Sequence, residues 1–251
     1  MTLSKPFRRI IRPFTDGEYL HGAKDDEIYI LNNSYAPDRS SLVRAYSIIE
    51  RNLIQLFDYV EPSDHNLKIY SHRTYELLLR ASTEFETNCK SILTANNYTR
   101  SSGGNLNITD YYKIDGASKL SEYSIILDAW LPRAKVFQPF KDWATGHSLA
   151  WYQSYNTVKH NRGKKFREAS LTNVMMSITG LLVILFSQFY VFAFNPYQSI
   201  GSYTVGDDDS IYIESSLFRI IPPSTWSSSE QYDFDWSAIK ASRNRFYRFR
   251  F

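Results

Sequence analysis

The chain has 251 residues, of which 43% are hydrophobic and 16% aromatic, and this composition excludes a globally disordered protein. The formal net charge is only +3, which excludes a general polyanion binder, although the placement of charges matters more than their sum. Cys89 is the only cysteine, so an internal disulfide and a multi-cysteine zinc site are both excluded.

The N-terminal residues, the single cysteine and the spacing of the histidines indicate where the protein is located and whether it holds a metal. The first 13 residues carry four cations with no apolar run after them, unlike a secretory signal, and a single free cysteine suits a reducing compartment. The histidines other than His160 are far apart and lack the spacing of metal ligands. We therefore expect a cytoplasmic protein with no metal and no cofactor.

Three segments are expected along the chain. Residues 1–36 form a basic N-terminal arm with a short hairpin around residues 23–26. Residues 37–195 form the helical domain. Residues 196–251 form a C-terminal extension that packs on the bundle and contributes strands at residues 211–214 and 217–221.

Apolar side chains recur at helical spacing in the middle segment. The predicted helices cover residues 38–59, 71–95, 109–123, 148–161 and 168–194. Pro132 and Pro139 interrupt the apolar residues 125–127 and 134–140, so a connecting loop with one short strand is expected there. The predicted fold is mainly α, an antiparallel helical bundle with short β-hairpin additions in the N- and C-terminal regions.

The last predicted helix is long and apolar enough to cross a membrane. No charged residue occurs between Glu168 and Asp207, and residues 174–194 suffice to span a bilayer. Small and polar side chains nevertheless form one stripe along this helix, where a neighbouring helix can approach closely. A single span would also leave the aromatic-rich remainder without a central helix. We favour a buried helix of a soluble protein, with a membrane anchor as the alternative.

A histidine and five cations lie close together just before this apolar helix. They are His160, Lys159, Arg162, Lys164, Lys165 and Arg167. Histidine can transfer a proton near neutral pH, while lysine and arginine bind phosphate oxygens. Cleavage of RNA through its 2′-hydroxyl needs this chemistry and no metal. The alternative is a histidine that caps the helix end beside a solvated basic turn, because cations stabilise a helix C-terminus.

Each of these residues has an expected role. Asn156, Lys159 and His160 share one face of the helix at i, i+3 and i+4. His160 would transfer the proton, and Asn156 with Tyr155 would position the phosphate or the histidine. Lys159 and Arg162 would bind the phosphate. Lys164, Lys165 and Arg167 would add positive charge for RNA.

The run from Tyr155 to Arg162, followed by Phe166 to Asn173 and a long apolar helix, resembles the HEPN superfamily. The likeness covers roughly residues 40–195 and also draws on residues 57–62 and 70–80. The superfamily consists of helical nucleotide- and RNA-handling domains, many of them in bacterial toxin–antitoxin and phage-defence systems. Catalytic members carry an arginine four to six residues before a histidine, and two copies meet across a dimer.

The resemblance implies that His160 is the signature histidine and Asn156 the polar residue of this motif. Tyr155 occupies the position of the signature arginine, and Arg is also absent at Ser154 and Gln153. The expected function is RNA handling in bacterial stress or antiviral defence, by a homodimer that is a candidate metal-independent endoribonuclease. A non-catalytic module that binds a nucleotide or a partner protein, such as an antitoxin, is the alternative.

The C-terminal residues 240–251 alternate arginine with aromatic residues and contain no acid. Arginine beside an aromatic side chain can neutralise phosphates while the ring stacks on bases. The same alternation suits an edge strand with one apolar and one charged face. We expect an edge strand, and RNA contacts are compatible with it.

Overall fold

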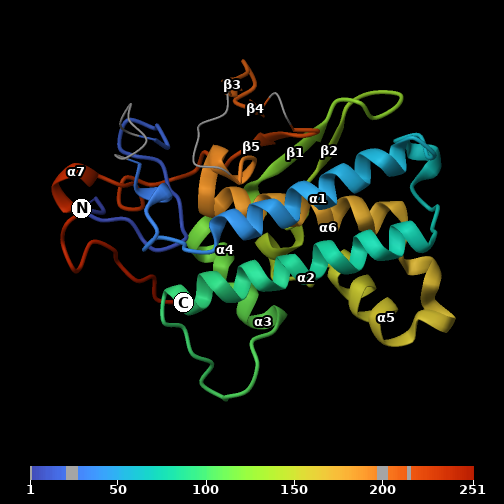
Figure 1. Ribbon diagram of the computed structural model, residues 1–251, viewed down its shortest axis with the longest axis horizontal. Helices are drawn as coiled ribbons and strands as arrows, with labels where there is room; N and C mark the ends of the chain where they lie inside the picture. The colour runs from blue at the N-terminus through green and yellow to red at the C-terminus, as the bar shows by residue number, and fades with distance from the viewer. Residues whose placement is uncertain (1, 21–27, 197–202, 214–215) are drawn as a thin grey trace.

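The structure, a computed structural model, describes residues 2–20, 28–196, 203–213 and 216–251. About 48% of it is helical, and a five-stranded antiparallel sheet lies beside the helices (Figure 1). The long helices are α1 (Arg39–Phe57), α2 (His72–Ala95), α5 (Ala150–Lys165) and α6 (Leu171–Phe189), and the short ones are α3 (Ile108–Tyr111), α4 (Lys113–Ser118) and α7 (Trp236–Ile239). The fold therefore combines helices with a sheet, which is more β structure than the expected terminal hairpins.

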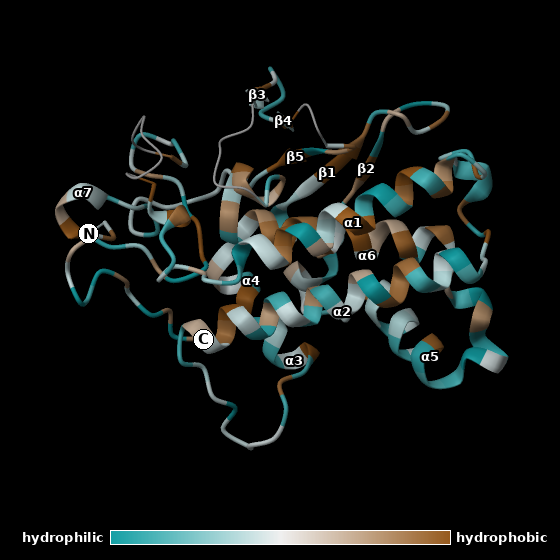
Figure 2. Cartoon of the chain, viewed as in Figure 1, coloured by the Kyte–Doolittle hydropathy of each residue, from teal (hydrophilic) through white to brown (hydrophobic). Residues whose placement is uncertain are grey.

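Helix α6 lies at the centre of the core, as expected. Every residue from 177 to 189 is buried, and Figure 2 shows the hydrophobic colour of this helix. Residues Leu171–Ala193 are the one segment of the described chain long and apolar enough to cross a membrane, and 94% of an apolar 18-residue window within it is buried. The core helix of a soluble protein has the same length and composition, so hydropathy alone does not distinguish the two.

Gly180 of α6 lies directly against Trp151 of α5. A Cβ atom added there would lie 3.2 Å from Cζ2 of Trp151 and 3.4 Å from Cζ of Phe140. Trp151 is itself fully buried and donates its indole N–H to the carbonyl of Pro139 at 2.9 Å. Gly180, one residue of the small-residue stripe, thus leaves space for the aromatic side chains of Trp151 and Phe140.

The four long helices α1, α2, α5 and α6 alternate in direction along the chain, so the second and the fourth of them are parallel (Figure 1). Tyr70 and Ser170 form a β-bridge immediately before α2 and α6 begin, and Gln188 donates to the side chain of Asn88 near their other ends. Helices α2 and α6 therefore run in the same direction (Figure 1). The connection between them is long enough to carry the chain back, because it contains α3, α4, two strands and α5.

The sheet has the strand order β2-β1-β5-β4-β3. Its strands are β1 (Ser124–Leu127), β2 (Lys135–Phe137), β3 (Tyr203–Val205), β4 (Ile211–Ile213) and β5 (Arg219–Ile221). The two strands predicted in the C-terminal extension are confirmed as β4 and β5. Two strands, the hairpin of β1 and β2, lie where a loop with one short strand was expected. They can pair because Pro132 and Pro139 both lie outside the paired residues.

The N-terminal arm departs from its prediction. The turn of the expected hairpin falls on residues 21–27, which lie outside the described residues. Tyr29–Leu31, expected to be a strand, forms a 3-10 turn. Its hydrogen bonds are local, from the backbone N–H of Leu31 to Ile28 and of Asn32 to Tyr29.

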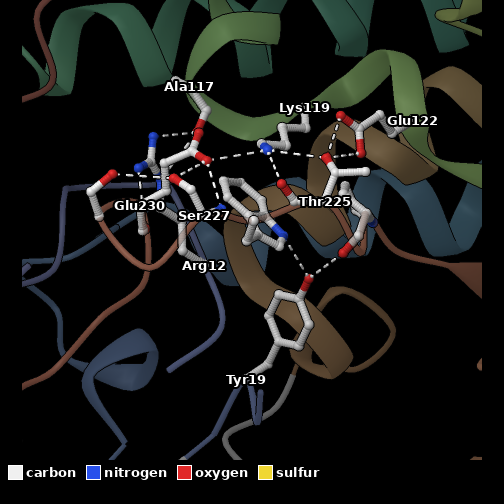
Figure 3. A network of polar contacts seen from close by, with 11 residues as sticks. Arg12, Tyr19, Ala117, Lys119, Glu122, Thr225, Ser227 and Glu230 are labelled. Carbon is white, nitrogen blue, oxygen red and sulfur yellow. Dashed lines mark hydrogen bonds and ion pairs between the residues drawn. The ribbon is translucent and has the colours of Figure 1, made fainter. Parts of the chain in front are cut away.

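The arm instead packs against the C-terminal extension, as Figure 3 shows around Arg12. The buried guanidinium of Arg12 donates to the carbonyls of Ala117 and Glu230, at 2.8 and 3.2 Å. Lys119 lies 3.3 Å from the carboxylate of Glu230 and donates to Thr225. These contacts join the arm, the end of α4 and the extension into one unit.

The C-terminal residues form no strand among the described residues, so the expected edge strand is wrong. Phe249 packs on Phe7 with ring centroids 5.3 Å apart, and a single parallel bridge joins Phe7 to Tyr247. Asn96, at the end of α2, donates to the carbonyl of Arg8 and accepts from the N–H of Phe249, both at 2.9 Å. One buried amide therefore ties the arm, α2 and the tail together.

Candidate nucleic-acid interface

The predicted basic segment forms the connection from α5 to α6. Helix α5 continues beyond its expected end at residue 161, but Asn161 interrupts it with φ −141° and ψ 48°. A further helical turn reaches Lys165, a 3-10 turn covers Phe166–Glu168, and Ser170 caps α6. We call residues 159–167 the basic turn. Hydrophilic residues dominate this part of α5 in Figure 2.

The cations of the basic turn all face solvent. The side chains of Lys159, Arg162, Lys164, Lys165 and Arg167 are exposed. Glu168 is the only acid between Asp142 and Asp207. Among the residues that the structure describes, none of these five cations forms an ion pair. Their charge is therefore uncompensated and available to an anionic ligand.

Tyr155 does not line the surface as the sequence predicted. Its side chain is 1% exposed, so it cannot contact a phosphate directly. Instead, Lys159 donates to the Tyr155 hydroxyl at 3.0 Å and lies 5.0 Å from the centroid of its ring. This hydrogen bond is the main cause that raises the pKa of Lys159. The buried tyrosine therefore orients the exposed lysine from beneath.

His160 and Asn156 lie near the basic turn but are not joined to each other. The imidazole of His160 is exposed, and no described side chain or backbone group forms a hydrogen bond with it. Asn156 is half-buried one turn before it. A general base is usually held in place by a second group. Within the part of the chain that the structure describes, His160 has cationic neighbours but no orienting partner.

Aromatic side chains at the start of α2 support the basic turn from the other side. Tyr70, His72 and Tyr75 surround Phe166, with ring centroids 5.0–5.9 Å from it. The guanidinium of Arg162 lies 5.5 Å from the ring centroid of Tyr75, and that of Arg167 lies 5.9 Å from Tyr70. The sequence did not assign these aromatic residues to the site, since periodicity alone does not show that α2 begins beside the end of α5.

The arrangement offers cations and exposed aromatic surface together. Tyr70 is 41% exposed, and arginine guanidinium groups held over rings present a flat, charged surface. Single-stranded nucleic acids bind through this combination, because phosphates pair with cations while bases stack on planar groups. Among the described residues, no three His, Cys, Asp or Glu side chains gather where they could hold a metal ion.

Comparisons with protein-family models, with curated proteins and with solved structures found no match to this chain. The candidate site is an exposed basic turn beside an aromatic cluster, and both lie on a helical core.

Proposed function

We propose that this protein binds single-stranded RNA through the basic turn. The observation that carries the proposal is that five cations are exposed and that none of them forms an ion pair with a described residue. Each phosphate neutralised by such a cation releases condensed counterions, which supplies affinity without base recognition. The aromatic cluster of Tyr70, Tyr75 and Phe166 adds a surface for stacking.

The choice of RNA rests on the HEPN resemblance. Support for a HEPN-like bundle is that α1, α2 and α6 pack together and that α5, which carries His160, directly precedes the apolar α6. The parallel direction of α2 and α6 agrees with such a fold, because the second and fourth helices of an up-and-down bundle run the same way. A cytoplasmic role in bacterial stress or phage defence, with an antitoxin-type partner, follows from the resemblance alone.

Metal-independent RNA cleavage is the second candidate function. It is favoured by the exposure of His160 between Lys159 and Arg162, where an imidazole could exchange a proton beside a bound phosphate. No group in the described part of one chain orients the ring. A homodimer that brings two copies of His160 into one cleft would supply the missing groups.

The binding proposal is tested with fluorescein-labelled single-stranded RNA of mixed sequence, by fluorescence anisotropy. Replacing Arg162, Lys164 and Lys165 by glutamine should weaken binding at least about tenfold. A matched control replaces three exposed cations elsewhere, Arg51, Arg133 and Lys141, and so changes the net charge equally. Equal losses in the two variants would mean that total charge, not the basic turn, determines binding.

A further inference from the structure

A second cationic site lies at the opposite end of α2. There the N-terminal arm crosses the last turns of this helix and leaves a pocket of about 420 Å³. Arg8, Arg9 and Lys90 contribute to its lining, together with the hydroxyl side chains of Thr87, Ser91 and Thr94. No carboxylate is among the described residues that line it.

The backbone separates the two consecutive arginines. Arg9 has φ 59°, a left-handed conformation that is unfavourable for a non-glycine residue. The turn directs Arg9 into the core, where it pairs with Asp38 and donates to Gln188. Arg8 stays half-buried at the pocket, and its carbonyl is fixed by the amide of Asn96. The charge of Arg9 is thus neutralised by Asp38 within the core. The charge of Arg8 is not neutralised by an ion pair with a described residue.

The C-terminal tail brings more positive charge to the same place. The guanidinium of Arg8 lies 5.5 Å from the ring centroid of Phe246, which places it beside the tail. Burial, and then the charges of Arg248, Arg245 and Arg9, lower the pKa of Arg8. Neither Arg8 nor Arg248 forms an ion pair with a described residue. An anion at this position would relieve the mutual repulsion of the guanidinium groups.

Unused hydroxyl donors complete the pocket. Thr87 donates its hydroxyl to the carbonyl of Thr83. The hydroxyls of Ser91 and Thr94 have no hydrogen-bond partner among the described residues. They stand on the same helix as Lys90, whose ammonium group is 3.6 Å from Glu86 and whose side chain is 47% exposed. A tetrahedral oxyanion can accept from a guanidinium, an ammonium and two hydroxyls at once.

We propose that the pocket formed by Arg8, Lys90, Ser91 and Thr94 binds a phosphate group, free or carried by a nucleotide. The site is distinct from the basic turn. Lys90 is 15 residues along α2 from Tyr75, which is roughly 22 Å at the rise of an α-helix. One phosphate cannot reach both sites, so the proposal stands without the RNA-binding function.

Isothermal titration calorimetry tests the proposal with three probes, inorganic phosphate, adenosine 5′-monophosphate and adenosine. We expect binding of both phosphate-bearing probes and none of adenosine. Tighter binding of the nucleotide would identify a nucleotide as the source of the phosphate, and equal affinity would identify phosphate itself. The proposal would be overturned if adenosine bound with the same affinity as adenosine 5′-monophosphate, or if none of the three probes bound.

Two variants locate the binding. Lys90→Gln should weaken phosphate binding about tenfold or more, since a charge-assisted hydrogen bond is lost, and its exposed position leaves the fold intact. Ser91→Ala should weaken it less. Arg51→Gln, an exposed cation of α1, is the matched control and should bind as the wild type does. Unchanged affinity in Lys90→Gln would place the phosphate elsewhere and contradict the proposal.

The basic-turn variant separates this site from the RNA-binding proposal. With Arg162, Lys164 and Lys165 replaced by glutamine, phosphate should still bind the α2 pocket with wild-type affinity. Loss of phosphate binding in that variant would assign the phosphate to the basic turn and remove the second site. Loss of RNA binding with retained phosphate binding leaves both proposals standing.

Discussion

The ammonium group of Lys159 donates to the hydroxyl of Tyr155 at 3.0 Å and lies 5.0 Å from the centroid of its ring. The tyrosine is buried and the lysine is exposed. A rigid side chain of the core therefore restricts the position of a cation on the surface. A lysine held in this way loses less conformational freedom when it binds a phosphate.

Replacing Tyr155 by phenylalanine tests this arrangement. The change keeps the buried ring and removes only the hydroxyl, so RNA affinity should fall about two- to tenfold, the range expected for one net hydrogen bond. Fluorescence anisotropy measures the effect, with Tyr152→Phe as a control on the same helix, since its hydroxyl bonds to Glu86 instead. A loss as large as that of the triple basic-turn variant would show that Tyr155 contacts RNA itself.

Replacing His160 by alanine separates binding from cleavage. Because the imidazole lacks an orienting partner among the described residues, we expect the wild type in EDTA to leave single-stranded RNA intact on a denaturing gel. His160→Ala should then look the same. The contrary result is cleavage of RNA in EDTA by the wild type and by the control His147→Ala, but not by His160→Ala. The protein would then be a nuclease, and the expectation of binding alone would be wrong.

The close approach at Gly180 predicts a sensitive core position. Leucine at this position would collide with Trp151 and Phe140, so Gly180→Leu should lower the free energy of unfolding by about 1–3 kcal/mol or more. Urea denaturation followed by tryptophan fluorescence measures this. Gly116→Ala in α4 is the control, because nothing lies within 4 Å of its added Cβ, and it should keep or slightly raise stability. Wild-type stability of Gly180→Leu would mean that α5 can move away from α6.

Buried Glu50 links α1 to the C-terminal extension and makes stability depend on pH. Its carboxylate accepts from Tyr46, Ser216 and the N–H of Leu217, but burial raises its pKa above the ordinary 4.5. The folded state therefore holds this proton more tightly than the unfolded state. The stability that Glu50 contributes to the folded protein is fully present below about pH 4.5, the ordinary pKa. It is lost as the pH rises through the pKa of Glu50 in the folded state.

The measurement for Glu50 compares urea unfolding of the wild type and Glu50→Gln across that pH range. Glutamine keeps an acceptor oxygen and carries no titrating proton. The difference in unfolding free energy should move in favour of Glu50→Gln as the pH rises, because only the wild type must bury a charge. A difference that is constant with pH would show that Glu50 titrates normally in the folded protein.

The sequence predicted those parts of the fold that local patterning controls. Helices α1 and α2 lie within about two residues of their expected bounds, because their apolar residues recur every three to four positions. One short strand was expected where the β1–β2 hairpin lies, and the second strand was missed. The strands have four and three residues, which is too short for alternation to be distinguished from an irregular apolar run. The pairing of β1 with β5 joins segments far apart in the chain, which no local pattern specifies.

The candidate site was predictable to a similar extent. Charge and helical spacing correctly indicated that the cations after Lys159 would face solvent. The burial of Tyr155 was not evident, because its i, i+4 relation to Lys159 suits a surface pair equally well. The contact of Arg162 with Tyr75 depends on where α2 begins relative to the end of α5, and that is a property of the packed helices.

The central claim is that the basic turn binds the phosphates of a nucleic acid, and its most direct test is the salt dependence of RNA affinity. Binding of single-stranded RNA by the wild type should weaken linearly on a plot of log Kobs against log salt concentration. Replacing Arg162, Lys164 and Lys165 by glutamine should reduce the magnitude of that slope by about 2, since each single-strand phosphate contact contributes about 0.7. The control variant of Arg51, Arg133 and Lys141 should keep the wild-type slope. A slope unchanged by the loss of the three basic-turn cations would contradict the account.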